Sequence, residues 1–590
     1  MFEFRSEKVT EKITRIHGFS DEQMYLIEGR DRAALIDTGC GIGDLRQYVK
    51  SLTDQEIIVI LTHGHTDHAM GSGQFDTVYM SHLDDAVLEE HRQREYRDAY
   101  LRIMPGFAAL EEADYQEPAD AGAMQDLTDD QTFDLGGITL RILAFPGHTP
   151  GMMTVLIEEE KLLLVGDACN PMTFLFMHEA LSLQEYEENL IAFKEKMQGR
   201  FYRVLFSHGV VEDPAADILD NVLAVIGQIH AGNTDDVPTP FVDGTVGLLA
   251  KKVDENFRTE DGKLGNIVYQ PKNMLRCDNF RNLFGSGDDA RDAGLTTPGD
   301  VIRYDDIVYG EDPKWQSLDV YRPKAAGGPQ AAGEAPAAGK SQAAGDSAAA
   351  FPAKLPVIVS VHGGGWVYGD KERYQFYCMD LARRGFAVVN FSYRLAPEAK
   401  FPAALEDTNA VFRWVLSNTE MYGLDTENIF VVGDSAGAQY ASQYLTMLTS
   451  PDYAALFDID VPAGALKVRA VGLNCGVYDM KAYAASESEG WRRDFLGAGY
   501  DPQMKQLDVL PYITKEFPPA FIVTSYYDFL RALQAPMYAL LQEKGVPCEL
   551  HEFGGEERPE IAHVFHLDVR SETGRECNDL ETAFFRKYMT

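Results

Sequence analysis

The chain has 590 residues, of which 45% are hydrophobic, an ordinary share for folded protein that excludes a mainly disordered chain. Its 53 basic and 92 acidic residues give a formal charge of −39, so its surface repels phosphate backbones and nucleic acid is not expected as a partner. The start of the sequence lacks the apolar core of a secretion signal, and no apolar run is long enough to span a bilayer. Seven scattered cysteines without CxxC pairs fit a reducing compartment. We therefore expect a cytoplasmic protein without a membrane partner, and homo-oligomerisation stays open.

The first stretch of sequence, residues 1–275, mixes strand and helix signals. Short apolar runs that end in turn signals predict strands at Met24–Glu28, Ala33–Asp37 and Ile57–Thr62. A helix is predicted over Ser182–Met197, where the first residue and Glu185 have capping-box spacing and one face is apolar. This pattern predicts an α/β domain.

A second α/β pattern occupies residues 299–590, after a polar, glycine-rich stretch at 276–298 that predicts the connection between two domains. Continuous apolar runs predict buried parallel strands at Val357–Val361, Phe386–Phe391, Ile429–Val432 and Phe521–Val523. An Ala/Gly-rich segment at 325–350 predicts a loop insertion inside this second domain, since glycine and proline break its helical tendency.

Metal-ligand residues cluster in LTHGHTDHAMGSG, residues 61–73, directly after an apolar strand. Imidazoles and carboxylates of this kind hold zinc and similar divalent ions. Three later candidates also follow strand-like runs, so all of them can converge on one edge of a sheet. The candidate ligands are His63, His65, Asp67, His68, His148, Asp167 and His208.

The HxHxDH motif and the order of the later ligands resemble the metallo-β-lactamase superfamily over residues 1–275, in particular its glyoxalase-II-like and lactonase-like members. The resemblance implies an αββα sandwich with two divalent ions, for which Zn²⁺ is favoured while Mn and Fe stay open. It further implies a water between the ions acidic enough to supply hydroxide at neutral pH. The implied ligands of one ion are His63, His65 and His148, and those of the other ion are Asp67, His68 and His208. Asp167 is implied to bridge the two ions. Asp37 is implied to support the metal-binding loop without contacting an ion.

Departures from other family members narrow the chemistry of this half. Redox members carry a glutamate where this chain has His65, which disfavours an oxygen-reducing di-iron site. The short interval between Asp167 and His208 leaves no room for the large insertion of nucleic-acid-processing members. An ester, thioester, lactone or phosphodiester substrate remains. The helix-like sequence at Leu83–Glu117 predicts either a lid over this site or a surface insertion.

The second half carries GxSxG around Ser435, between a predicted strand and a predicted helix, as a nucleophile elbow requires. An earlier glycine-rich segment, VHGGGWVYGDK at residues 361–371, allows backbone N–H groups to point at an oxyanion. Together with YRLAPEAKFPAALED (393–407), these motifs resemble the hormone-sensitive-lipase-like carboxylesterases over residues 296–590. The resemblance implies an α/β-hydrolase fold with a doubly wound, mostly parallel sheet. The implied oxyanion donors are Gly364, Gly365 and Ala436.

The family order of serine, acid and histidine implies Asp528 and His563 as partners of Ser435. Val564 replaces the usual glycine after the histidine, so His566 stays as an alternative base. Asp434 is expected to be structural, and Met480–Leu510 is expected to form a cap over the pocket.

We interpret the whole as a bifunctional hydrolase of small ester- or lactone-type molecules, a serine carboxylesterase joined to a metallohydrolase. Two alternatives stay open. One half is a non-catalytic binding or assembly module, or the serine half is an amidase or formamidase, because the same triad cleaves either bond.

Overall fold

The computed structural model describes residues 2–209, 217–242, 244–324, 354–497, 499–501 and 504–590. The insertion predicted at 325–350 lies outside the described residues. The chain divides into two compact units, Met1–Asn279 and Phe280–Thr590. Among the described residues, no helix combines the length and the apolar character needed to cross a membrane.

The first unit is built on two main sheets. One has the order β1-β2-β3-β4-β5-β6-β7, with bounds Arg5–Lys8, Ile13–His17, Gln23–Glu28, Ala33–Ile36, Ile57–Ile60, Val78–Met80 and Gln125–Asp126. The other has the order β13-β11-β10-β9-β8, with bounds Arg203–Phe206, Leu162–Gly166, Met153–Ile157, Thr139–Ala144 and Thr132–Asp134. A smaller sheet has the order β12-β16-β15-β14, with bounds Thr173–Phe174, Ile267–Tyr269, Val246–Leu249 and Val237–Pro240.

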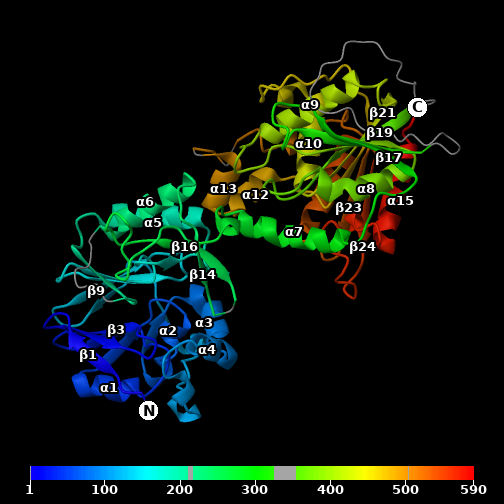
Figure 1. Ribbon diagram of the computed structural model, residues 1–590. Helices are drawn as coiled ribbons and strands as arrows, with labels where there is room; N and C mark the ends of the chain where they lie inside the picture. The colour runs from blue at the N-terminus through cyan, green and yellow to red at the C-terminus, as the bar shows by residue number, and fades with distance from the viewer. Residues whose placement is uncertain (1, 210–216, 243, 325–353, 498, 502–503) are drawn as a thin grey trace. The chain divides into compact units, whose positions relative to one another are not determined.

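Side-chain alternation along these strands produces four layers. Ile27 and Leu162 belong to the core between the two main sheets, whereas their neighbours Leu26 and Leu163 belong to the outer cores. Helices supply the other side of each outer core: Leu45 of α1 packs with the first sheet, and α5 and α6 pack with the second. The layers are visible in Figure 1. The helix bounds are Leu45–Leu52 for α1, Thr66–Ala69 for α2, Asp85–His91 for α3, Arg94–Leu101 for α4, Leu183–Met197 for α5 and Ile218–His230 for α6.

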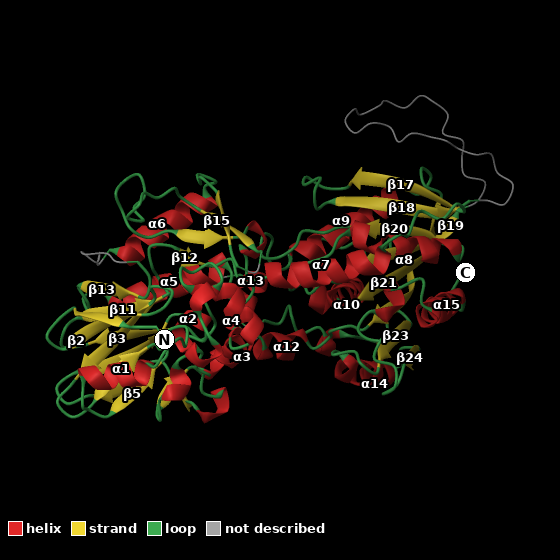
Figure 2. Cartoon of the chain, turned by 60° about the horizontal axis from the view of Figure 1, so that its bottom comes forward, coloured by secondary structure: helices red, strands yellow, loops and turns green. Residues whose placement is uncertain are grey.

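The second unit has one sheet in the order β17-β18-β20-β19-β21-β22-β23-β24. β18 is antiparallel to both of its neighbours, and the strands from β20 to β24 are parallel. Figure 2 shows helices flanking these strands. The strand bounds in sheet order are Val301–Val308, Ser317–Pro323, Ala387–Phe391, Leu355–Val361, Leu424–Asp434, Val468–Asn474, Ala520–Ser525 and Cys548–Phe553.

Helices cover this sheet on both faces. Residues of α8 and α15 share one core with the strands, and α9, α10 and α14 pack against the sheet without contributing to that core. The bounds are Lys371–Arg383 for α8, Ala403–Ser417 for α9, Ala436–Thr449 for α10, Gln534–Lys544 for α14 and Glu572–Arg586 for α15, with the short α11, α12 and α13 at Pro451–Ala454, Met480–Ser486 and Glu489–Leu496. The predicted fold classes of both halves are confirmed, because parallel strands buried on both faces are the doubly wound arrangement.

The stretch expected as a glycine-rich connection folds as helix α7, Asp278–Asp292. Two glycines lie inside it, which by propensity alone disfavours a helix. Packing on the second unit outweighs that penalty: the Arg281 side chain donates to the Val367 carbonyl at 2.8 Å, and the Tyr368 hydroxyl donates to Asp288 at 2.7 Å. A loop-like composition was therefore a poor guide to the structure of this segment.

Glu581 of α15 is a carboxyl buried against the sheet of the second unit, 1% exposed. Its oxygens accept hydrogen bonds from the Asn474 amide at 2.9 Å and the Tyr377 hydroxyl at 3.1 Å. Burial raises the pKa of Glu581 from 4.5 to about 7. The unfolded chain releases this proton near pH 4.5 and the folded chain only near pH 7, so this group lowers stability as the pH rises between these values.

Replacing Glu581 with glutamine should remove this pH-dependent loss, which amounts to at most about 3 kcal/mol. We expect the variant to show a flatter pH dependence of the unfolding free energy of the second unit from pH 5 to 8, measured by denaturant titration. Glu576→Gln, an exposed position on the same helix, should keep the wild-type slope. An unchanged slope in Glu581→Gln would contradict the assignment.

Candidate active sites

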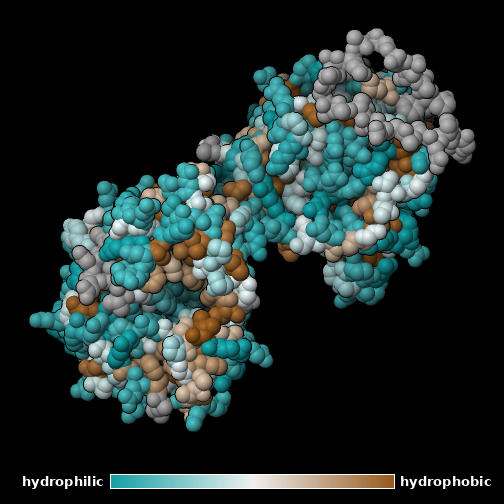
Figure 3. Space-filling model, viewed as in Figure 1, coloured by the Kyte–Doolittle hydropathy of each residue, from teal (hydrophilic) through white to brown (hydrophobic). Residues whose placement is uncertain are grey.

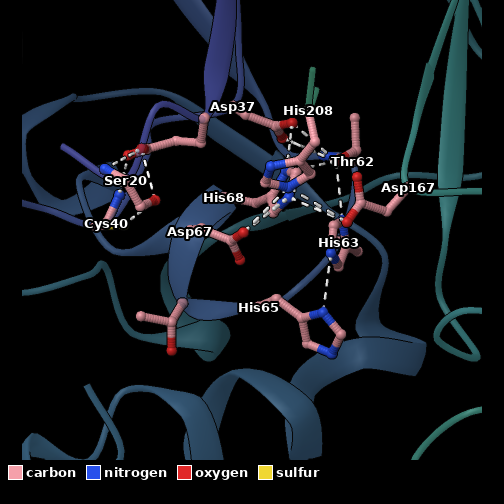
Figure 4. Close-up of polar contacts among 12 residues, drawn as sticks. Ser20, Asp37, Cys40, Thr62, His63, His65, Asp67, His68, Asp167 and His208 are labelled. Carbon is pink, nitrogen blue, oxygen red and sulfur yellow. Dashed lines mark hydrogen bonds and ion pairs between the residues drawn. The ribbon is translucent and has the colours of Figure 1, made fainter. Parts of the chain in front are cut away.

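The seven predicted metal ligands lie together at one edge of the sandwich of the first unit. Four of them follow strand ends, since His63 comes after β5, His148 after β9, Asp167 after β11 and His208 after β13. His65 precedes helix α2, which contains Asp67 and His68. Figure 4 shows ligands from both main sheets pointing toward a common centre.

One group consists of three imidazoles whose nitrogens almost touch. The Nδ1 atom of His65 lies 3.1 Å from Nε2 of His63 and 3.0 Å from Nε2 of His148. Three ring nitrogens that meet this closely in a buried place form a group that can hold one cation.

The second group consists of Asp67, His68 and His208. The Oδ2 atom of Asp67 lies 3.1 Å from Nε2 of His208 and 3.7 Å from Nε2 of His68. Oδ2 of Asp167 lies 3.4 Å from His208 and 3.6 Å from His148, so this carboxylate stands between the two groups. The structure thus brings the seven predicted ligands together in two adjoining groups.

Hydrogen bonds on the far side of the rings orient the ligands. Asp37 lies 2.8 Å from Nδ1 of His68, and its carboxylate also accepts from the backbone N–H and hydroxyl of Thr62. Nδ1 of His148 donates to the carbonyl of Phe174 at 2.8 Å. Such contacts fix which nitrogen of each imidazole faces the cluster.

Burial and neighbouring charges set the protonation of the cluster. Burial lowers the pKa of His65 to about 3, and it lowers the pKa of His63 well below its ordinary value. Burial also opposes charge on His208, but Asp167 outweighs it and raises the pKa of His208 to about 10. The pKa of Asp167 is lowered despite its burial, because His208 lies beside it.

These residues fit divalent cations. Nε2 of His68 is buried without a hydrogen-bond partner among the described residues, although two carboxylates face it. Side chains bind metals as neutral imidazoles and ionised carboxylates, the forms that the lowered pKa values of His63, His65 and Asp167 favour. His68 and His208, whose pKa values the nearby carboxylates raise, would release a proton on binding a metal. The donor set of nitrogen and oxygen atoms suits zinc as well as manganese and iron.

The second site begins at the turn between β21 and α10. Ser435 occupies this turn with φ 51° and ψ −120°, a left-handed conformation that side chains rarely adopt. The sharp turn places its side chain in a cavity of about 110 Å³ that His563 also lines. This geometry is that of a nucleophile elbow.

Asp528 holds His563 in place. Its Oδ1 lies 2.7 Å from Nδ1 of His563, and its Oδ2 accepts from the Thr524 hydroxyl at 2.7 Å. Burial alone would raise the pKa of Asp528, but the hydrogen bond from His563 lowers it below its ordinary value. His566 is buried instead at 1% exposure, and burial lowers its pKa to about 3. The structure thus places His563 beside the acid, with Val564 tolerating a φ of 52° where the family has glycine.

The glycine-rich loop before α8 lies next to Ser435. Gly364 has a φ of 119°, and a Cβ there would meet the Tyr368 carbonyl at 2.1 Å, so only glycine fits. Behind the loop, the Tyr374 hydroxyl accepts from the Gly363 N–H and donates to Asp434 at 2.7 Å. Asp434 therefore holds the glycine-rich loop in position through Tyr374, and burial raises the pKa of Asp434 to about 7.

Aromatic side chains close the cavity around Ser435. Phe280 and Phe284 of α7 stack with ring centroids 4.2 Å apart, and Tyr483 of α12 reaches the same cavity. Tyr483 comes from the stretch expected as a cap, whereas α7 was expected only as a connection. The serine cavity is thus lined by two segments outside the sheet.

Comparisons with known proteins agree with both geometries. Residues 17–208 match the family model of the metallo-beta-lactamase superfamily, and residues 358–567 match that of the alpha/beta hydrolase fold. The chain joins a metallo-beta-lactamase domain to an α/β-hydrolase domain. The family of the first domain implies binding of divalent metal ions, and its histidine clusters agree with that.

Individual relatives match the α/β-hydrolase domain. Esterase LipI of Mycobacterium tuberculosis is 32% identical over 211 residues, which cover 34% of this chain and 63% of LipI. An acetyl esterase of Salmonella schwarzengrund is 28% identical over 225 residues, which cover 35% of this chain and 65% of that esterase. The chain thus spans just under two thirds of each of these curated relatives. Esterase B from Lactobacillus rhamnosis, a solved structure, is 22% identical with a TM-score of 0.43 and covers 52% of this chain and 93% of that protein.

Two carboxylates of the metallo-beta-lactamase domain escaped the sequence reasoning. Glu179 lies 2.8 Å from Nε2 of His65, and His91 stacks on the His65 ring at 4.3 Å. Asp84 accepts from the N–H of Gly64 at 3.0 Å and from the hydroxyl of Thr149 at 2.7 Å, which ties the first ligand loop to that of His148. No motif or strand-end position marks either residue in the sequence.

Proposed function

We propose that the chain is a bifunctional hydrolase, with a serine carboxylesterase in residues 299–590 and a dinuclear metal-dependent hydrolase in residues 1–275. The esterase assignment rests on one observation above all: His563, which lies 2.7 Å from Asp528, lines the same cavity as Ser435 at its elbow. Relatives named as esterases support this chemistry.

In the esterase, Ser435 Oγ attacks the acyl carbon of a bound ester and His563 takes its proton. Asp528 accepts from Nδ1 of His563, which stabilises the charged imidazole. His563 then returns the proton to the leaving alcohol, and a water molecule releases the acid and restores Ser435. Backbone donors worth about 3 kcal/mol each stabilise the oxyanion, and we assign them to Gly364, Gly365 and Ala436.

The size of the cavity favours short acyl groups. Its volume is about 110 Å³, and bulky aromatic rings from α7, α12 and the glycine-rich loop limit it. One relative is named an acetyl esterase and another an ethyl acetate hydrolase. We assign small carboxylic esters as its substrates.

In the metallo-beta-lactamase domain, we assign one metal ion to His63, His65 and His148 and a second to Asp67, His68 and His208, with Asp167 between them. When bound, divalent ions supply Lewis acidity, which polarises an acyl carbonyl and makes water acidic near neutral pH. We favour zinc because its usual protein ligands are this combination of imidazole nitrogens and carboxylates.

The chain's own residues prepare this site. Asp37, the Phe174 carbonyl and Glu179 hold three of the imidazoles by their outer nitrogens, so their inner nitrogens face the cluster without rearrangement. We assign hydrolysis of an ester, thioester or lactone to this arrangement.

An activity screen of the full chain, with and without a chelator, tests both assignments. Hydrolysis of p-nitrophenyl acetate should survive chelation, whereas hydrolysis of thioesters or lactones should be lost and should return with added Zn²⁺. Elemental analysis should find about two ions per chain, and it identifies the metal. Ester hydrolysis that chelation abolishes, or a chain that takes up no metal, would overturn the respective half of the proposal.

Replacing Glu179 with leucine should weaken metal binding about 10- to 100-fold, because His65 then loses the partner that directs Nδ1 toward the cluster. Competition against a chromophoric chelator measures this affinity. Glu179→Gln keeps an acceptor for Nε2 of His65 and should restore most of it. Glu89→Leu, at an exposed carboxylate of α3 that pairs with Arg92, is the control. Unchanged affinity in Glu179→Leu would mean that the loop alone orients His65.

A further inference from the structure

The cavity beside the metal cluster is much larger than the serine cavity, and a large part of its wall is apolar. Its volume is about 360 Å³. Figure 3 shows hydrophobic side chains bordering a hollow in the first unit. Beyond the ligands, the wall residues that matter here are Ile103, Met104, Met172, Phe174, Met177 and Phe241.

The aromatic part of this wall is built into the small sheet. Phe174 of β12, the nearby Phe176 and Phe241, just after β14, pack edge to face, with centroids of Phe176 and Phe241 5.7 Å apart at 84°. Such edge-to-face packing fixes the rings. Segments from α4 onward, with Ile103 and Met104, supply another part of the wall. The apolar space is therefore a preformed surface of the fold.

The charged residues that line this cavity also limit which substrates it can bind. None of the described residues that line the cavity is lysine or arginine, and its carboxylates are the cluster members Asp67 and Asp167. A substrate that carries phosphates or carboxylates away from its reacting bond would find no lysine or arginine to pair with among these described lining residues. The net charge of −39 also disfavours the approach of anions.

We propose that the metal-dependent site takes an uncharged ester, thioester or lactone whose acyl part is an apolar chain of medium length. This inference rests on the proposed metallohydrolase function and narrows it. Water adds across the acyl bond: its oxygen joins the acyl carbon, the bond to the alcohol or thiol sulfur breaks, and the leaving group receives a proton. Nucleotide phosphodiesters and glutathione thioesters are excluded as preferred substrates.

The test uses the full-length Ser435→Ala chain loaded with Zn²⁺, in which the serine site is silent. Three thioesters are compared: S-octanoyl-N-acetylcysteamine, S-acetyl-N-acetylcysteamine and S-octanoylglutathione. The first two differ only in acyl length. The first and third share the acyl group, but the thiol of the third is larger and charged, so the lysine variant described next is needed to isolate the effect of charge. We expect kcat/KM for the octanoyl cysteamine thioester to exceed each of the others at least about tenfold, the order of discrimination that apolar pockets provide.

Wall variants connect the preference to this cavity. Phe257, 37% exposed at the cavity, accommodates a lysine, so Phe257→Lys should raise the rate on the glutathione thioester relative to the neutral thioester several-fold. Ile191→Lys, at an exposed position on α5 away from the cavity, should leave the ratio unchanged. Phe241→Ala should lower the octanoyl-to-acetyl ratio, and circular dichroism verifies that each variant is folded.

The outcomes separate this inference from the function on which it rests. Hydrolysis that favours the glutathione thioester, or that ignores acyl length, overturns the inference and leaves a metallohydrolase in place. No hydrolysis of any of the three by a chain that holds metal overturns the metallohydrolase assignment and the inference with it. The expected order, shifted by Phe257→Lys but not by Ile191→Lys, supports the inference.

Discussion

Replacing Ser435 with alanine should reduce chelator-resistant hydrolysis of p-nitrophenyl acetate at least about 10³-fold in kcat/KM. The reason is local: the strained turn presents this one hydroxyl to the cavity that His563 lines, with His563 held by Asp528. The measurement is initial-rate kinetics of the full chain in the presence of a chelator, so that the metal site does not contribute.

Matched variants make this result specific. Ser417→Ala, at the exposed end of α9, should keep wild-type rates. His563→Ala should lose activity like Ser435→Ala, whereas His566 lies outside the cavity lining and its replacement should affect stability rather than the pH profile of kcat. Wild-type turnover by Ser435→Ala would place the ester hydrolysis elsewhere in the chain.

Local patterns were good guides to the elements. The predicted helix at Ser182–Met197 is α5, with Ser182 as its cap and Glu185 completing the capping box, so that prediction is confirmed. The apolar run Val357–Val361 lies within β19 and Ile429–Val432 within β21, because strands buried on both faces leave no polar alternation to misread. The ends of predicted strands also indicated where the candidate site residues lie, since neighbouring parallel strands end at the same edge of their sheet.

The features that escaped depend on tertiary packing. Helix α7 contains Gly285 and Gly287 in a polar sequence, and its contacts with the α/β-hydrolase domain stabilise it. Glu179 contacts His65, and Asp84 contacts Gly64, in each case across a long interval of sequence. An acidic residue in a polar segment gives no sequence signal of such a contact. Sequence motifs therefore identify metal-binding and reacting residues more readily than the residues that hold those side chains in position.

Replacing Asp167 with alanine should have the widest effect on the metal site. Its carboxylate lies 3.6 Å from His148 of one ligand group and 3.4 Å from His208 of the other. We therefore expect the affinity for both ions to fall, by about 100-fold or more, and the metal-dependent hydrolysis to disappear. Metal content after dialysis against a defined free-zinc buffer measures the loss.

His208→Ala provides the matched comparison, since this imidazole belongs to one ligand group only. It should remove about one ion per chain and leave the other bound at His63, His65 and His148. Hydrolysis of p-nitrophenyl acetate should stay at the wild-type rate in both variants, because Ser435 lies in a separate compact unit. Circular dichroism then verifies that the first unit, which carries the substitutions, is folded. If both variants lost the same single ion, Asp167 would serve one ion rather than two, and the two ligand groups would have to be treated as independent sites.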